Sequence, residues 1–211
     1  ISLIVSDSVD YGNANIIQLD NTWSYLVNLN GPQFKLISPQ DSIITSDSYQ
    51  KAIVLLSDNN GIDDSSIRLR VNSSNYPDTK FSTIDDELSF HDDTLTFIPS
   101  VPFINGDIVV FTLDSIADKF GNTGSDKSWY FYVDLEAPKA QILFPLNDTI
   151  TYQFDPISIK ITDSKSSVNG SSIVLSLNGR NFSIGDSGIS WNDTILTFNP
   201  KEADPILEYK N

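Results

Sequence analysis

Acidic and amide side chains gather in two stretches of the chain that favour turns. Within residues 57–66 and again within 113–126, side chains that carry oxygen follow one another at short spacing. Ca²⁺ binds six to eight such hard oxygens in loose geometry, and several loops together can supply them. We therefore consider a calcium site with ligands from both stretches. The candidate metal ligands are Asp58, Asp63, Asp114 and Asp118.

The elements that would bring these carboxylates together are loops at one end of a β-sandwich. An early interstrand loop, the last hairpin loop and the incoming linker, here Asn28–Asn30, share one pole of such a fold. The cofactor expected at this interdomain pole is Ca²⁺. A second hypothesis stays open, because Asp and Asn are favoured in turns for hydrogen bonding to nearby backbone. In Asp118–Asn122, Gly121 would supply a positive φ and Asp118 would cap the loop.

Five Asn-x-Ser/Thr sequons provide candidate glycosylation sites. Composition alone predicts about four, so their number is no argument, but all five fall in turns or edge positions and four of them lie between residues 147 and 194. In an exported protein these positions would be exposed acceptors. The candidate asparagines are Asn72, Asn147, Asn169, Asn181 and Asn192.

The residue inventory argues against an enzyme. His91 is the only histidine, the chain has no cysteine, and the turn equivalent to that of His91 carries Asn192. Ser-His-Asp and Cys-His arrangements therefore cannot be assembled. The stretch 121–124 lacks the lysine of a phosphate-binding loop. We expect no catalytic residues.

The composition is strongly acidic. The formal net charge is −15 and the calculated pI is about 4.1. This balance argues against nucleic-acid partners, which need basic surfaces. Apolar runs such as Ala52–Leu56 are too short to cross a bilayer, so we expect no direct membrane insertion within these residues.

The three tryptophans have two interpretations. Trp23 and Trp129 open equivalent segments, and Trp191 stands where the related segment has Phe90. Recurrence at matching positions favours packing inside a fold. A platform of aromatic side chains for carbohydrate is the alternative.

The chain repeats itself with a period of about one hundred residues. WSYLVNLNGP (23–32) returns as WYFYVDLEAP (129–138), and DSSIRLRVN (64–72) returns as GSSIVLSLN (170–178), both at an offset of 106 residues. FHDDTLTFIP (90–99) returns as WNDTILTFNP (191–200), at an offset of 101. Such a period is typical of tandem small domains rather than solenoid units. We expect the C-terminal strands of one module in 1–30, a complete module in 31–135 and a module lacking its last strands in 136–211, so that the chain is a window of a longer protein.

Strand patterns dominate the complete module. In 66–71 apolar residues alternate with arginines, while 50–57 and 107–113 are almost continuously apolar, as in central strands. Asn178-Gly179 is a strong two-residue hairpin pattern. The fold class we predict is all-β, with tandem immunoglobulin-like β-sandwich modules. The expected strands are 33–37, 50–57, 66–71, 80–84, 86–90, 94–98, 107–113 and 128–133.

The order of these motifs resembles the tandem bacterial and archaeal Ig-like (Big-type) repeats of surface-layer and adhesin proteins. The resemblance rests on the W/F-x-D-T-x-L-T-F-x-P segment, the D-x-x-G-N turn and the W-x-F-x-V-D-x-x-x-P segment, and it extends over nearly the whole chain. It implies an extracellular protein of the cell surface, and its motifs specify fold better than function.

The function that we expect is a structural extracellular spacer or assembly protein of a surface layer or surface filament. Its partners would be neighbouring copies of itself or other surface proteins. The alternative is a binding module, either an adhesin stalk or a carbohydrate-binding repeat. A spacer predicts modules that are interchangeable. A binding role predicts that one module has an exposed aromatic or polar cluster that the other modules lack.

Overall fold

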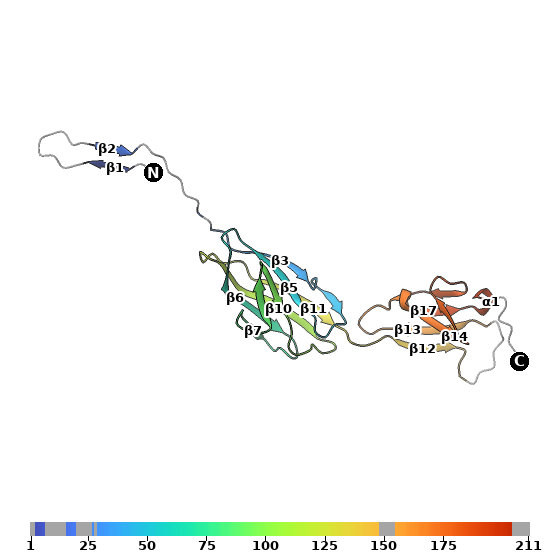
Figure 1. The fold of residues 1–211 in the computed structure, drawn as a ribbon. Helices are drawn as coiled ribbons and strands as arrows, with labels where there is room; N and C mark the ends of the chain where they lie inside the picture. Colours follow the sequence, from blue (N-terminus) through green and yellow to red (C-terminus); the bar gives the residue numbers. More distant parts are fainter. Residues whose placement is uncertain (1–2, 7–15, 20–26, 28, 148–154, 204–211) are drawn as a thin grey trace, which may run out of the picture.

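The computed structural model describes residues 3–6, 16–19, 27, 29–147 and 155–203. Nearly all the regular secondary structure in the described part of the chain is β-strand (Figure 1). A short hairpin pairs β1 (Leu3–Ser6) with β2 (Ile16–Leu19). A central unit and a third unit follow along the chain. No helix in the described ranges is long and apolar enough to span a membrane.

The central unit is a sandwich of two sheets. The first sheet has the order β3-β5-β9-β8, and the second has the order β4-β11-β10-β6-β7. The strands of the first sheet are β3 (Gln33–Ser38), β5 (Ala52–Ser57), β8 (Leu88–His91) and β9 (Thr94–Phe97). The strands of the second are β4 (Ile43–Thr45), β6 (Ile62–Asn72), β7 (Thr79–Phe81), β10 (Ile108–Asp118) and β11 (Lys127–Val133). This is the immunoglobulin-like sandwich that the strand patterns predict.

Alternation along each strand builds the core between the two sheets. In β6, Ile67, Leu69 and Val71 are buried, while Arg68 is exposed. A cluster of aromatic rings fills the centre of this core, and within it the Phe111 ring stacks on Trp129 with centroids 5.2 Å apart. Burial of such large rings is the main stabilising contribution to a core of this kind.

The central unit also has features that the sequence patterns did not predict. Strands β6 and β10 are both longer than expected, and β10 carries register shifts on either side of Ser115. These bulges let β10 continue past the sandwich body to Asp118. The short strand β4 pairs parallel with β11, and the Ser42 amide donates to the Tyr130 carbonyl at 2.8 Å.

The third unit repeats the first sheet of the central unit. Its order β12-β13-β17-β16 matches β3-β5-β9-β8, and a register shift interrupts the first strand pair of both sheets. A two-stranded sheet, β14-β15, turns at Asn178-Gly179, where both residues have positive φ as the hairpin prediction requires. The strands are β12 (Lys139–Phe144), β13 (Ile157–Thr162), β14 (Val174–Leu177), β15 (Arg180–Ser183), β16 (Ile189–Trp191) and β17 (Ile195–Phe198). A 3₁₀ turn, Gly170–Ser172, precedes β14, and one helical turn, α1 (Pro200–Ala203), follows β17.

The described part of the third unit contains no counterparts of β10 and β11. Its buried core consists of Phe182, Ile189, Leu196 and Phe198. At the N-terminal end of the chain, β1 pairs with β2 (Ile16–Leu19). The segment that begins at Trp23, expected as the last strand of the first module, lies mostly outside the described residues.

Candidate metal and glycan sites

Asp118 is the most enclosed of the four candidate calcium ligands. It ends β10 with an exposed fraction of 1%. Its Oδ1 accepts hydrogen bonds from the Phe120 and Asn122 amides at 2.9 and 2.8 Å, and its Oδ2 accepts one from Asn122 Nδ2 at 2.9 Å. Burial opposes ionisation, but the hydrogen bonds from Asn122 and Phe120 outweigh it and lower the pKa of Asp118. Through these hydrogen bonds Asp118 caps the turn, and Gly121 within it has φ +86°, both as the loop hypothesis predicts.

Asp58 and Asp63 lie at the same end of the central unit as Asp118. Residues Ile62 and Asp63 pair with Asp118 and Ala117 at the extended end of the sheet. Asp58 Oδ1 accepts from the Asn60 amide at 2.8 Å. Asp63 Oδ1 accepts from the amide and the hydroxyl of Ser65 at 3.1 and 2.7 Å. Each carboxylate therefore stabilises the turn in which it lies, by accepting a hydrogen bond from the amide two residues later.

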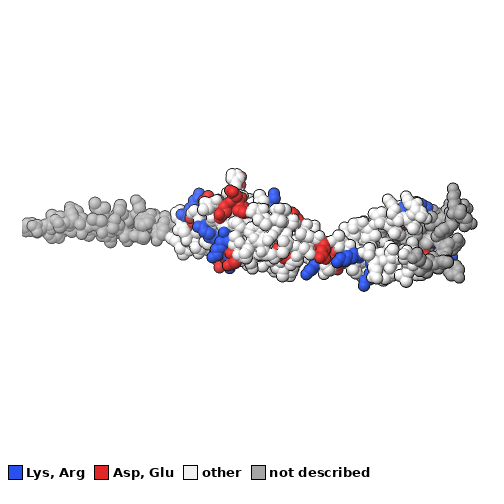
Figure 2. Space-filling model, turned by 90° about the horizontal axis from the view of Figure 1, so that it is seen from below, with Lys and Arg blue, Asp and Glu red and all other residues white. Residues whose placement is uncertain are grey.

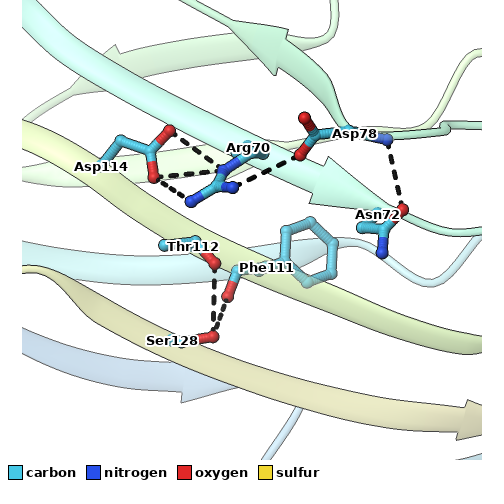
Figure 3. Close-up of polar contacts among 7 residues, drawn as sticks. All are labelled: Arg70, Asn72, Asp78, Phe111, Thr112, Asp114 and Ser128. Atoms are coloured by element: carbon cyan, nitrogen blue, oxygen red, sulfur yellow. Dashed lines mark hydrogen bonds and ion pairs between the residues drawn. The ribbon is translucent and has the colours of Figure 1, made fainter.

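Asp114 lies apart from the other three, on the sheet surface. Arg70 holds it through Nη2 at 2.7 Å and through Nε, and the same guanidinium reaches Asp78 at 3.4 Å (Figure 3). The hydrogen bond to Asp114 is the main cause of the raised pKa of Arg70. Next to this group, Thr112 and Ser128 link β10 to β11 across the sheet (Figure 3).

The linker reaches the acidic end of the central unit, as the calcium hypothesis requires. A cavity of about 300 Å³ there is lined by Asn30, Gly31, Gln33, Ser57, Asp58 and Asn59. Within the described residues, no three acidic, histidine or cysteine side chains converge closely enough to share a metal ion. Calcium at this pole stays a prediction, with Asp58, Asp63 and Asp118 at one end of the central unit and Asp114 bound to Arg70.

Two further buried carboxylates were not singled out as ligands by sequence. Asp107 has an exposed fraction of 7% and accepts from the Ser74 hydroxyl and from the Ile104 amide at 3.1 Å. Asp134 has an exposed fraction of 5% and lies where the central unit meets the third. Acidic and basic side chains are mixed at that junction on the face in Figure 2. In the sequence, Asp107 comes directly before one apolar strand and Asp134 directly after another, and these positions were the available indication.

All five sequon asparagines are exposed. They fall at the end of β6, after β12, before the 3₁₀ turn, in β15 and after β16. The side chains of Asn72, Asn169 and Asn192 also take part in local structure, and Asn192 Oδ1 accepts from the Ile195 amide at 2.7 Å. Asn169 Oδ1 accepts from the Ser171 hydroxyl at 2.7 Å, and Asn72 Oδ1 accepts from the Asp78 amide at 3.2 Å. Occupancy by glycan stays a prediction.

The tryptophans and His91 were the remaining candidates for a binding or catalytic role. Trp129 has an exposed fraction of 3% and packs in the core against Phe34 and Phe111, which agrees with the packing interpretation. Trp191 is partly buried, and Trp23 lies outside the described residues. The His91 side chain is 88% exposed and its Nε2 is 3.1 Å from Asp92, a position on a solvated turn.

Comparison with known proteins adds little beyond the fold. No protein-family model matches the chain, and no curated protein sequence matches it. Among solved structures, dimeric latent PorU from Porphyromonas gingivalis is similar at 15% identity and a TM-score of 0.39, over 64% of this chain and 13% of the PorU chain. A chimeric titin Z1Z2 carrying a decorin peptide is similar at 16% identity and a TM-score of 0.32, over 85% and 86% of the two chains. A marsupial T cell receptor is similar at 13% identity and a TM-score of 0.39, over 79% and 62%. Since these scores are low, the assignment of the fold rests on the sheet topology itself.

Proposed function

We propose that this chain is part of a structural spacer outside the cell, built from tandem Ig-like modules of a surface layer or surface filament. The observation that carries the proposal is the repetition of one sheet architecture in two successive units. The order β3-β5-β9-β8 recurs as β12-β13-β17-β16. Modules that repeat a fold without a distinctive cleft are suited to setting distance.

The connection between the two units supports a semi-rigid spacer. Only five residues separate the end of β11 at Val133 from the start of β12 at Lys139, and the linker ends in Pro138. Proline restricts the backbone at that point. Glu136 accepts a hydrogen bond from Asn105 of the central unit at 3.2 Å and another from Ser164 of the third unit at 3.3 Å. A short linker bound on both sides limits the angles that two modules sample.

Distance measurement between two labels tests the rigidity directly. The chain has no cysteine, so Ser89→Cys in β8 and Ser176→Cys in β14, both at exposed positions, provide two unique sites for spin labels. We expect one narrow distance distribution. A broad distribution, like that of modules on a flexible string, would contradict a spacer of defined length.

The location outside the cell needs a separate test. An antibody raised against residues 31–135 should label intact source cells without permeabilisation. Labelling only after permeabilisation would contradict the proposed location, whatever the rigidity of the junction.

A further inference from the structure

Three exposed apolar side chains form a row on the outer face of the second sheet of the central unit. Ile44 of β4 lies opposite Tyr132 of β11, and Tyr132 lies opposite Ile108 of β10. Their exposed fractions are 45%, 38% and 52%. Side chains in register on neighbouring strands are close enough to form one continuous surface. Contiguous apolar side chains with polar groups around them are typical of binding surfaces, whereas single exposed apolar residues are not.

The Tyr132 ring is held in place by a second tyrosine on the same strand and face. The rings of Tyr130 and Tyr132 meet in a T-shaped contact with centroids 5.5 Å apart. A ring that is already fixed loses less side-chain entropy when a ligand binds. At the equivalent positions, the segment 23–32 of the repeat has Ser24 and Leu26. The tyrosine pair is therefore an exposed aromatic cluster that the related segment lacks, as a binding role predicts.

A cavity of about 220 Å³ adjoins this row where the central unit meets the third. Its lining includes Ile44, Tyr132, Val133, the carboxylates of Asp107 and Asp134, and Lys165 of the third unit. The lysine ammonium can donate hydrogen bonds and the carboxylates can accept them. Among the described residues Lys165 is exposed and forms no ion pair. The cavity therefore combines an apolar wall with hydrogen-bonding groups of both kinds.

The size and charge of this site limit the ligands that fit it. A cavity of about 220 Å³ is smaller than the roughly 300–1,000 Å³ typical of sites for drug-sized ligands, so it suits a single ring. A stable protein partner needs about 800 Å² on each side, far more than three side chains and a small cavity supply. The two carboxylates outnumber the one ammonium group, and the net charge of the chain is −15, so an anionic ligand is disfavoured. A sugar ring is neutral, has an apolar C–H face, and carries hydroxyl groups that both donate and accept.

We propose that the central unit binds a neutral carbohydrate at this place, with one sugar ring packed against Tyr132 between Ile44 and Ile108. The hydroxyl groups of the sugar would accept from Lys165 and donate to the carboxylate of Asp134. Such a site would attach the chain to a glycan through one of its modules. The proposal stands on the row and the adjoining cavity and does not depend on the spacer function.

A glycan array probed with the fluorescently labelled full chain tests this proposal, with neutral and acidic oligosaccharides printed side by side. We expect binding to neutral oligosaccharides. Tyr132→Ala should weaken it by about tenfold or more, because the sugar would lose most of the apolar surface that it covers. Lys165→Met should weaken it less. The matched control is Phe120→Ala, which removes an exposed aromatic ring from the turn after β10, at the other end of the unit, and should bind like the wild type.

A titration followed by nuclear magnetic resonance locates the site independently. The neutral oligosaccharide that binds best on the array should shift the backbone signals of 43–45, 106–110 and 130–134 in the isotope-labelled full chain. Circular dichroism of Tyr132→Ala should match the wild type, because this side chain lies outside the core. Ile44→Ala, on an edge strand, provides a second variant that should also weaken binding.

Four results would each overturn the proposal. They are the absence of binding to any neutral glycan, binding to acidic glycans alone, and equal binding by the wild type, Tyr132→Ala and Ile44→Ala. The fourth is self-association of the chain that Tyr132→Ala abolishes, since this would identify the row as a protein interface.

Discussion

The central and third units each contain a four-stranded sheet with the same strand order, and they differ in what covers that sheet. Leu56 in β5 and Ile161 in β13 occupy equivalent places, since their partners Phe34 and Ala140 lie 106 residues apart in the repeat. Leu56 has an exposed fraction of 0%, whereas Ile161 is only partly buried. In the central unit, Phe111 and Phe131 of β10 and β11 fill the space between the sheets.

This difference separates the pairing of a sheet from its burial. The third unit reproduces the strand order of the first sheet, although its described residues contain no counterparts of β10 and β11. Burial of that sheet in the central unit depends on a second sheet, in which β6 pairs with β10 some forty positions later. A strand can therefore be paired in the same order while its apolar face is only partly covered.

The largest expected effect comes from separating the two units. Residues 31–135 should unfold cooperatively with a free energy of about 5–15 kcal/mol, typical of a small complete domain. Residues 136–211 should reach less than about 3–5 kcal/mol, because a small and partly open core buries little apolar area. Urea titration monitored by circular dichroism measures both. Equal stability per residue would show that the third unit is closed in a way the described residues do not reveal.

Matched core truncations probe the same contrast at single positions. Leu56→Ala should destabilise the central unit by about 2–5 kcal/mol, the range for a fully buried leucine. Ile161→Ala should cost about 1 kcal/mol, because part of that side chain already contacts water. Hydrogen exchange of the full chain, followed separately over 52–57 and 157–162, measures each. Equal costs would contradict the assignment of an uncovered face to the third unit.

Acid should affect the central unit through Asp118, on a strand with no described counterpart in the third unit. Its pKa is lower in the folded state than in the unfolded chain, where aspartate titrates at about 3.9. The stabilisation is therefore complete above that pH and is lost as pH falls through the folded pKa. Asp118→Asn should unfold more readily at neutral pH and show a shallower loss of stability below about pH 4. An unchanged acid titration in this variant would refute the role of Asp118.

The smallest expected effect concerns the surface ion pairs of β6 and β10. Arg70 binds Asp114 and Asp78 at a partly exposed position, where water and salt weaken the attraction. Arg70→Met should therefore lower the free energy of unfolding by less than Leu56→Ala does. In 1 M NaCl, the stability difference between Arg70→Met and the wild type should become smaller still. A double-mutant cycle with Asp114→Asn isolates the pair. A coupling as large as the core effect would show that this pair, absent from the third unit as described, helps to fix the second sheet.

Most of the strand pattern was predictable from sequence, and the less predictable parts have physical causes. Regular alternation in 66–71 and the Asn178-Gly179 pair depend on near neighbours, so they correctly predicted the C-terminal part of β6 and the β14–β15 hairpin. Strand β4 was missed because three residues give too short a pattern, and its pairing with β11 depends on contacts nearly ninety positions apart.

The candidate site was less predictable than the fold. The loops of the expected sandwich predicted that Asp58, Asp63, Asp114 and Asp118 gather at one end, and the structure places the segments of Asp58, Asp63 and Asp118 there. The sequence could not show that Asp114 pairs with Arg70 across two strands. Nor could it reveal that Asp134 is buried where the central unit meets the third, because that burial depends on how the two units meet.

The parallel pairing of β4 with β11 has a consequence for mechanical load. Strand β4 lies near the start of the central unit and β11 at its end, so tension along the chain pulls these strands past each other. The Ser42 amide to the Tyr130 carbonyl and the Asp134 amide to the Thr45 carbonyl bracket the pair. Bonds loaded in shear share the force and break together, unlike those of a hairpin pulled open one at a time. We expect the central unit to resist stretching more than the third unit, as single-molecule extension would measure, and equal rupture forces would refute this. A module with such a clamp would keep its length under tension until the whole strand pair ruptures.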